Sequence, residues 1–191
     1  MMKSQDSERY SMIRLFETFI HSLSCVCEQD SYLFNQPSMK IPFSFRLAST
    51  LQKEVMPLLP DSYFIDMAIA ATTEAKALIP DILIHDRAKE NKDVLLAIVC
   101  KNGYLSEQEL IGLHTLKNSS TCDLALGVAI LPQQDYLLIY RSDEMFVDYY
   151  HFYKEQQHCS FLKRREIGDL EIDEKQLNLP ISMKKRVSPR R

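Results

Sequence analysis

Glycine and tryptophan are scarce in this chain of 191 residues, which contains four glycines and no tryptophan. Walker and Rossmann phosphate loops are built from clustered glycines, so this scarcity argues against both kinds of nucleotide site. The G-x-S-x-G pattern of a nucleophile elbow is also missing, which leaves a Ser/His/Asp hydrolase of that class without support. The composition is otherwise that of an ordinary globular protein, with 46% hydrophobic and 26% charged residues.

Long apolar runs are lacking as well. No stretch approaches about 18 uninterrupted apolar residues, so the sequence predicts no membrane-spanning helix. The polar start, MMKSQDSERY, is unlike a secretory signal peptide. The five cysteines are an odd number, and the Cys25-x-Cys27 pair has no second pair at zinc-like spacing. We therefore expect free thiols in a reducing cytoplasm.

A surplus of positive charge is the third feature that the chain lacks, because its formal net charge is −3. This value argues against a strong non-specific DNA binder but allows a local basic patch. Basic residues gather late in the chain, at Lys163, Arg164 and Arg165 and in the tail KKRVSPRR. Two interpretations of them stay open, namely contact with nucleic acid or an acidic partner, and a solvated tail.

Apolar periodicity predicts both helices and strands. Helices are predicted over residues 8–28, 43–59, 105–117 and 143–157, and strands over 63–71, 79–85, 94–100, 124–131 and 135–141. Ser106 and Glu109 have the spacing of a capping box at the start of the third helix. The order predicts an α/β protein with a three-strand meander, a helical crossover and a central mixed sheet flanked by helices.

Changes in pattern divide the chain into three parts. Residues 1–42 are interpreted as an N-terminal helix and connecting segment, 43–158 as a core domain, and 159–191 as a charged extension with a basic tail. The length suits one domain with a substantial core.

Two polar residues stand out in the apolar stretch 79–101. Asp81 follows Pro80 at the start of one expected strand, and Lys101 closes the next. Adjacent strands joined by a polar turn bring these ends to one side of the sheet, where a carboxylate and an ammonium group can hold a hard cation and a phosphate. The competing interpretations are a strand-start aspartate bonded to backbone N–H groups of the adjacent turn and a solvated lysine at the end of a strand.

Pro80-Asp81 followed by a strand ending in Lys101 resembles the PD-(D/E)XK nuclease superfamily, whose fold is that of the restriction endonucleases. The resemblance covers roughly residues 44–140 and implies an αβββαβ core. It implies that Asp81 binds Mg²⁺ and that Lys101 activates or positions the attacking water. The acidic position of the motif falls on Val99, which cannot ligate a metal.

Several acids can replace the missing ligand. Glu107 and Glu109 lie on the helix after Lys101, Glu74 precedes the Asp81 strand, and Glu54 lies on the helix before the sheet. Gln108 can contact a phosphate. For each of these side chains, a solvated surface position is the competing interpretation.

Histidine and aromatic residues offer further candidates. His85 and His114 can approach the site, although a structural or exposed role is favoured for both. Asp66 lies inside a strand, where an outward pleat position is the simpler interpretation. Four late aromatic residues can stack on bases or serve as core and interface residues: Tyr149, Tyr150, Phe152 and Tyr153.

These features predict a divergent PD-(D/E)XK-like protein that binds or processes nucleic acid, with DNA as a partner. If the site is active, it is a Mg²⁺-dependent phosphodiesterase that uses Asp81 and Lys101. The alternative is a non-catalytic domain on the same fold that binds a protein partner or a second copy of the chain.

Overall fold

The computed structural model describes residues 3–36, 38–67, 78–88, 94–119 and 122–170. Two helices begin the chain, α1 (Lys3–Gln29) and α2 (Lys40–Glu54), and each is followed by a short 3-10 helix, η1 (Ser31–Asn35) and η2 (Met56–Leu58). The remaining elements form a seven-stranded sheet and one further helix: β1 (Tyr63–Met67), β2 (Ile82–Asp86), β3 (Val94–Asn102), α3 (Glu107–Ser119), β4 (Leu124–Ile130), β5 (Tyr136–Ser142), β6 (Phe146–Tyr153) and β7 (His158–Glu166).

The strands lie in the sheet in the same order as in the chain. β3 and β4 are parallel, and α3 makes the crossover between them, whereas every other neighbouring pair is antiparallel. A parallel pair needs such a crossover, while antiparallel pairs need only hairpin turns. The expected α/β class, with a mixed sheet flanked by helices, is therefore confirmed.

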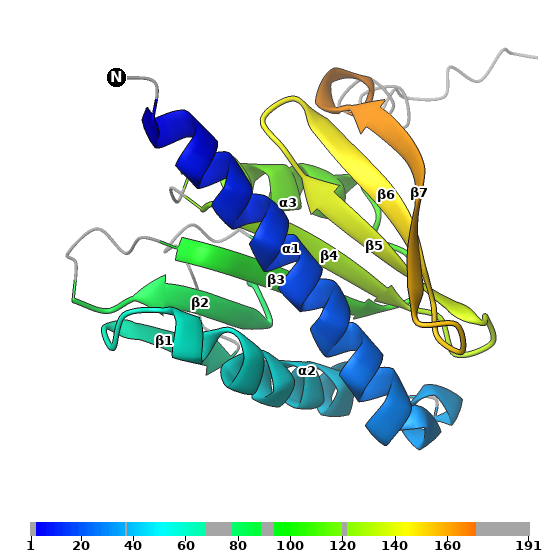
Figure 1. Ribbon diagram of the computed structural model, residues 1–191. Coiled ribbons are helices and arrows are strands. Elements are labelled where there is room, and N and C mark those ends of the chain that lie inside the picture. Colours follow the sequence, from blue (N-terminus) through cyan, green and yellow to red (C-terminus); the bar gives the residue numbers. More distant parts are fainter. Residues whose placement is uncertain (1–2, 37, 68–77, 89–93, 120–121, 171–191) are drawn as a thin grey trace, which may run out of the picture.

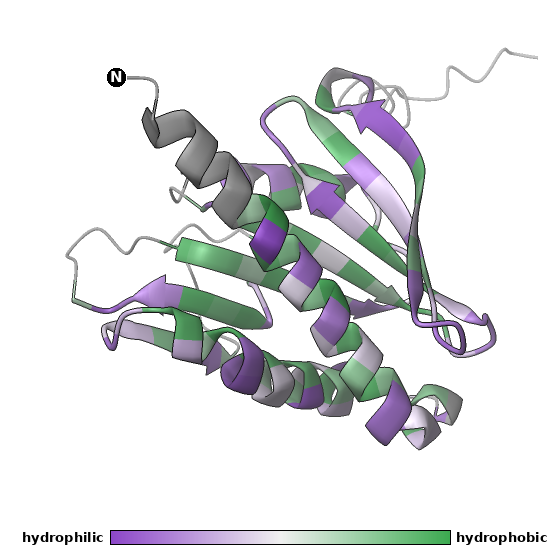
Figure 2. Ribbon diagram, viewed as in Figure 1, coloured by the Kyte–Doolittle hydropathy of each residue, from purple (hydrophilic) through white to green (hydrophobic). Residues whose placement is uncertain are grey.

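Helices cover both faces of the sheet. Figure 1 shows α1 and α2 on one face and α3 on the other. Alternation along β3 sends Ile98 and Cys100 into the core beneath α1 and α2, and Ala97 and Val99 into the core beneath α3. Figure 2 shows hydrophobic residues along β3 and β4 at the centre of the sheet and more hydrophilic ones along β7.

The prediction of a helix over 143–157 is wrong, because these residues contribute β6 and its turn into β7. Aromatic residues favour strands, and here they pack on both sides of the sheet, so the polar alternation typical of a half-buried strand is missing. Tyr150 packs against Phe16 of α1, with ring centroids 5.2 Å apart, whereas Tyr149 lies in the core beneath α3.

The predicted charged extension, residues 159–191, begins with most of β7, so the sheet extends to Glu166, beyond the predicted core range 43–158. The expected strand over 63–71 is β1 as far as Met67, and residues 68–71 lie outside the described residues. The basic tail and Glu74 also lie outside them.

Candidate functional site

Asp81 lies immediately before β2 and is held by the neighbouring strand. Its backbone N–H donates to the carbonyl of Ile98 (2.8 Å), and its Oδ2 accepts from the backbone N–H of Cys100 (2.7 Å). The other carboxylate oxygen, Oδ1, lies 2.9 Å from Nζ of Lys40 on α2. Only 15% of the Asp81 side chain is exposed, so this carboxylate is a largely buried group with both oxygens occupied.

Lys101 closes β3 and has a different partner. Its Nζ lies 2.5 Å from Oε2 of Glu109, which also accepts from the backbone N–H (2.7 Å) and hydroxyl (2.9 Å) of Ser106. The Ser106 hydroxyl accepts in turn from the N–H of Glu109 at 3.3 Å, which confirms the predicted capping box. Burial raises the pKa of Glu109, but the hydrogen bonds from Lys101 and Ser106 outweigh it and lower the pKa below its ordinary value.

Asp81 and Lys101 are thus engaged by helices on opposite faces of the sheet, Asp81 by α2 and Lys101 by α3. The expectation that their side chains converge on one side of the sheet is therefore wrong. Val99, which lies between them in the motif, is 5% exposed and packs in the core beneath α3. Each of the two charges therefore has its own counter-charge.

The other proposed helpers are dispersed. Oε1 of Glu107 pairs with Nη1 of Arg165 on β7 at 3.2 Å, and Glu54 lies 3.9 Å from Nε2 of His21 on α1. Gln108 is exposed. Nδ1 of His114 donates a hydrogen bond to the backbone carbonyl of Asp143 (3.1 Å).

A Mg²⁺ site needs several oxygen ligands that converge on one point. Within the described ranges, no group of three or more His, Cys, Asp or Glu residues is arranged to hold a metal ion. The carboxylate of Asp81 is already bound by Lys40 and the Cys100 N–H, so the residues described around it do not fit a hard cation.

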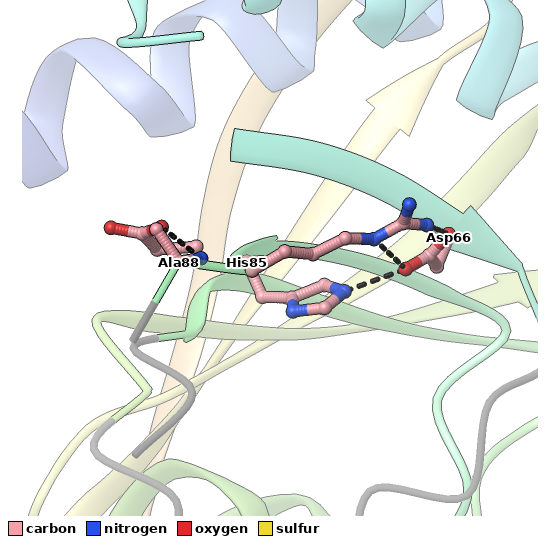
Figure 3. Close-up of polar contacts among 5 residues, drawn as sticks. Asp66, His85 and Ala88 are labelled. Carbon is pink, nitrogen blue, oxygen red and sulfur yellow. Dashed lines mark hydrogen bonds and ion pairs between the residues drawn. The ribbon is translucent and has the colours of Figure 1, made fainter. Parts of the chain in front are cut away.

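A second polar cluster lies on β1 and β2, where Asp66 joins His85 and Arg87 (Figure 3). Oδ2 of Asp66 lies 2.6 Å from Nε2 of His85 and accepts from Nε of Arg87 at 3.2 Å, while Oδ1 accepts from Nη2 of Arg87. The Asp66 side chain is 14% exposed, so the expected outward pleat position is wrong, since the carboxylate faces the buried His85.

Electrostatics in this cluster favour the ionised carboxylate. Burial raises the pKa of Asp66, but hydrogen bonds and charge from His85 and Arg87 lower it below its ordinary value. Among the described residues, Nδ1 of His85 is buried without a hydrogen-bond partner. The bonds from His85 and Arg87 to Asp66 make the cluster a polar anchor between two strands.

The third feature is a cleft of about 460 Å³ between the start of α3 and strands β5–β7, on the α3 face of the sheet. We call it the tyrosine cleft and define it by six of its lining residues: Tyr104, Tyr136, Tyr140, Tyr149, His151 and Lys163. The prediction that Tyr149 lies on a helix is wrong, and the sequence did not indicate that Tyr149 shares a cleft with Tyr104 and Tyr136. Alternation in FVDYYHFY and the following basic residues were the available signals.

Comparisons with protein-family models, with curated proteins and with solved structures gave no match. No helix in the described part of the chain is long and apolar enough to cross a membrane.

Proposed function

We propose that this chain is a restriction-endonuclease-like protein that binds nucleic acid without cleaving it. The order of elements supports the kinship, because the PD-(D/E)XK resemblance implies an αβββαβ core and the chain has a β1–β2–β3 meander, a crossover through α3 and a β4 parallel to β3. Asp81 lies immediately before β2 and Lys101 near the end of β3, where the resemblance would have them.

The observation that carries the proposal is the pairing of both motif charges. A nuclease needs the Asp81 carboxylate directed at a cation and the Lys101 ammonium beside the scissile phosphate. Here Lys40 neutralises the first and Glu109 neutralises the second. Val99, buried at the acidic position, supplies no carboxylate, and these features together favour a binding role over cleavage.

Nucleic acid is favoured as the ligand by the cations and rings on the β5–β7 side of the molecule. Lys163 and Arg165 lie on the same face of β7 and line a cleft that also contains four tyrosines. Cations that contact phosphates combined with aromatic rings that stack on bases are the usual means of binding single strands.

The test is a binding assay and a cleavage assay on the full chain, each with Mg²⁺, with Mn²⁺ and with a chelator. We expect fluorescence anisotropy to report binding of DNA or RNA that weakens with salt, does not require metal, and leaves the strand intact. Asp81→Asn, which keeps an acceptor for the Cys100 N–H, should bind as the parent does. Metal-dependent cleavage that is lost in Asp81→Asn would contradict the non-cleaving role, and absence of binding to any nucleic acid would contradict the function.

A protein-docking function is the second candidate, favoured by an apolar face on α2. Ile41 and Phe45 are one turn apart and are 78% and 59% exposed. Light scattering over a range of concentrations tests self-association. A dimer that is lost in Phe45→Ser and kept in Ile13→Ser, an exposed control on α1, would support this candidate.

A further inference from the structure

The tyrosine cleft lies outside the strands that carry the PD-(D/E)XK motif. Its walls come from three places: the loop before α3, strand β5, and the pair β6–β7. The loop contributes Tyr104, which is 55% exposed, and β5 contributes the partly buried Tyr136. These two hydroxyls lie 3.4 Å apart and span the cleft at its edge.

The floor of the cleft is aromatic and rigid. Tyr140 is 2% exposed, its hydroxyl accepts a hydrogen bond from the N–H of Leu105 (3.3 Å), and it meets Tyr149 edge-on with ring centroids 5.1 Å apart. Burial raises the pKa of both phenols, so the floor stays uncharged. Because these two rings are almost fully buried, they support the cleft from below, and the ring surface open to a base is that of Tyr104, Tyr136 and His151.

Strands β5 and β6 contribute a second set of rings. Tyr136 packs on His151 with centroids 4.3 Å apart and planes tilted by 38°, and Tyr153 meets Tyr136 at 6.4 Å. His151 lines the cleft and is half-buried, so it keeps part of its ring surface open to a ligand, whereas Tyr153 lies beside the lining residues and supports Tyr136. The rings belong to neighbouring strands, which fixes their spacing.

Cations lie along the β7 side. The exposed Lys163 has its ammonium 4.9 Å from the centre of the Tyr149 ring and is paired with no carboxylate in the ranges that the structure describes. Arg165, two residues along the strand and so about 7 Å away, pairs with Glu107 at the α3 side. The cleft therefore has two cations on one strand, and Lys163 is the one that is available to a phosphate.

We propose that the tyrosine cleft binds a short segment of single-stranded nucleic acid, with unpaired bases on its rings and the backbone along Lys163. This inference rests on the proposed function and specifies both the form of the ligand and its place on the protein. Bases in a duplex are stacked on both sides and cannot receive a tyrosine ring, whereas unpaired bases can. Lys163 lies beside the rings that line the cleft, so it can pair with the phosphate of a nucleotide whose base lies on them.

The experiment compares labelled single strands, the matching duplex and a mononucleotide in anisotropy titrations with the full chain. Single strands should bind more tightly than either of the other two. Tyr104→Ala should lower single-strand affinity roughly 5- to 150-fold, since it removes one stacking ring. Lys163→Gln should lower the slope of log affinity against log salt by about 1. Tyr104 is largely exposed, so its replacement leaves the fold intact.

Two matched control variants test whether a loss of affinity is specific to the cleft. Tyr32→Ala removes a tyrosine that is 62% exposed on η1, and Lys53→Gln removes an exposed lysine on α2, both outside the cleft. Neither should change affinity. The basic tail is present in every variant, so its contribution cancels.

Each failure has a separate meaning. Nucleic-acid binding that survives unchanged in Tyr104→Ala and Lys163→Gln overturns the cleft assignment but leaves the proposed function standing. Equal or tighter binding of the duplex or the mononucleotide overturns the single-strand assignment. If no nucleic acid binds at all, the proposed function and this inference both fall.

Discussion

Replacing Asp66 by Asn tests the polar anchor between β1 and β2. The substitution keeps the shape of the side chain but removes its charge. The Asp66 carboxylate faces His85, whose side chain is 4% exposed, and Arg87, whose side chain is 48% exposed. The two partners therefore contribute unequally to stability.

The expected magnitude follows from that exposure. A hydrogen bond to a charged group contributes about 1.5–3 kcal/mol when it is protected from water, as the bond to His85 is. The ion pair with the half-exposed Arg87 is screened by solvent and contributes about 0–1 kcal/mol. Asparagine retains one carbonyl acceptor, so we expect Asp66→Asn to lower the free energy of unfolding by about 1–3 kcal/mol.

The pH dependence gives the sign of the effect. The pKa of Asp66 is lower in the folded than in the unfolded protein, so its contribution is complete above the unfolded value of about 4 and is lost as the pH falls through the folded value. The difference in stability between parent and variant should therefore be constant from neutral pH down to about pH 5 and shrink below about pH 4.

Urea unfolding followed by circular dichroism at several pH values measures this difference. With a slope of roughly 2 kcal/mol per molar urea, the midpoint should fall by about 0.5–1.5 M near neutral pH. Asp61→Asn is the matched control, because Asp61 is exposed in the turn before β1. A difference for Asp66→Asn no larger than that control, or one that grows as the pH falls, would refute the reasoning.

Three further predictions concern glycines and thiols. Gly127→Ala should lower the free energy of unfolding by about 1–3 kcal/mol, because the added Cβ would lie 2.8 Å from Leu105 Cδ2 and 3.2 Å from Tyr140. Thermal unfolding measures this effect. Gly168→Ala is the control and should be neutral, because a Cβ at Gly168 would have no neighbour within 4 Å. Gly103→Ala should cost about 1–2 kcal/mol in the melt, since Gly103 has φ +92°; an unchanged melting temperature would contradict this. Burial raises the pKa of three thiols to about 12, those of Cys27, Cys100 and Cys122. In a thiol-reagent assay at mildly alkaline pH, the native protein should therefore protect these three thiols, and urea should expose them. Rapid labelling of all the thiols without urea would count against the buried positions.

Local signals in the sequence were sufficient for the centre of the fold. The strand over 94–100 is predicted by an almost uninterrupted apolar run, and it is β3, buried on both faces. The Ser106–Glu109 capping box is also local, because both partners lie within one turn of helix. Such features depend on neighbours in the chain and can be read without knowing the fold.

The candidate site depends on pairs of residues that are distant in the chain, and the sequence alone did not predict these pairs. Nothing near Asp81 indicates that Lys40 of α2 reaches it, and nothing near Asp66 indicates that His85 and Arg87 come from the adjacent strand. These pairings arise only when the sheet register and the helix packing are fixed.

The position of α1 has a consequence for how the protein is made. Phe16 of α1 packs against Tyr150 and lies under the guanidinium of Arg141, so α1 rests on strands that are translated much later than the helix itself. Until β5 and β6 emerge, the part of α1 around Phe16 lacks the strands that cover it in the folded protein. We expect a ribosome-arrested chain that stops at Ser142 to be cut readily by protease within α1, and one that extends past Glu166 to resist it.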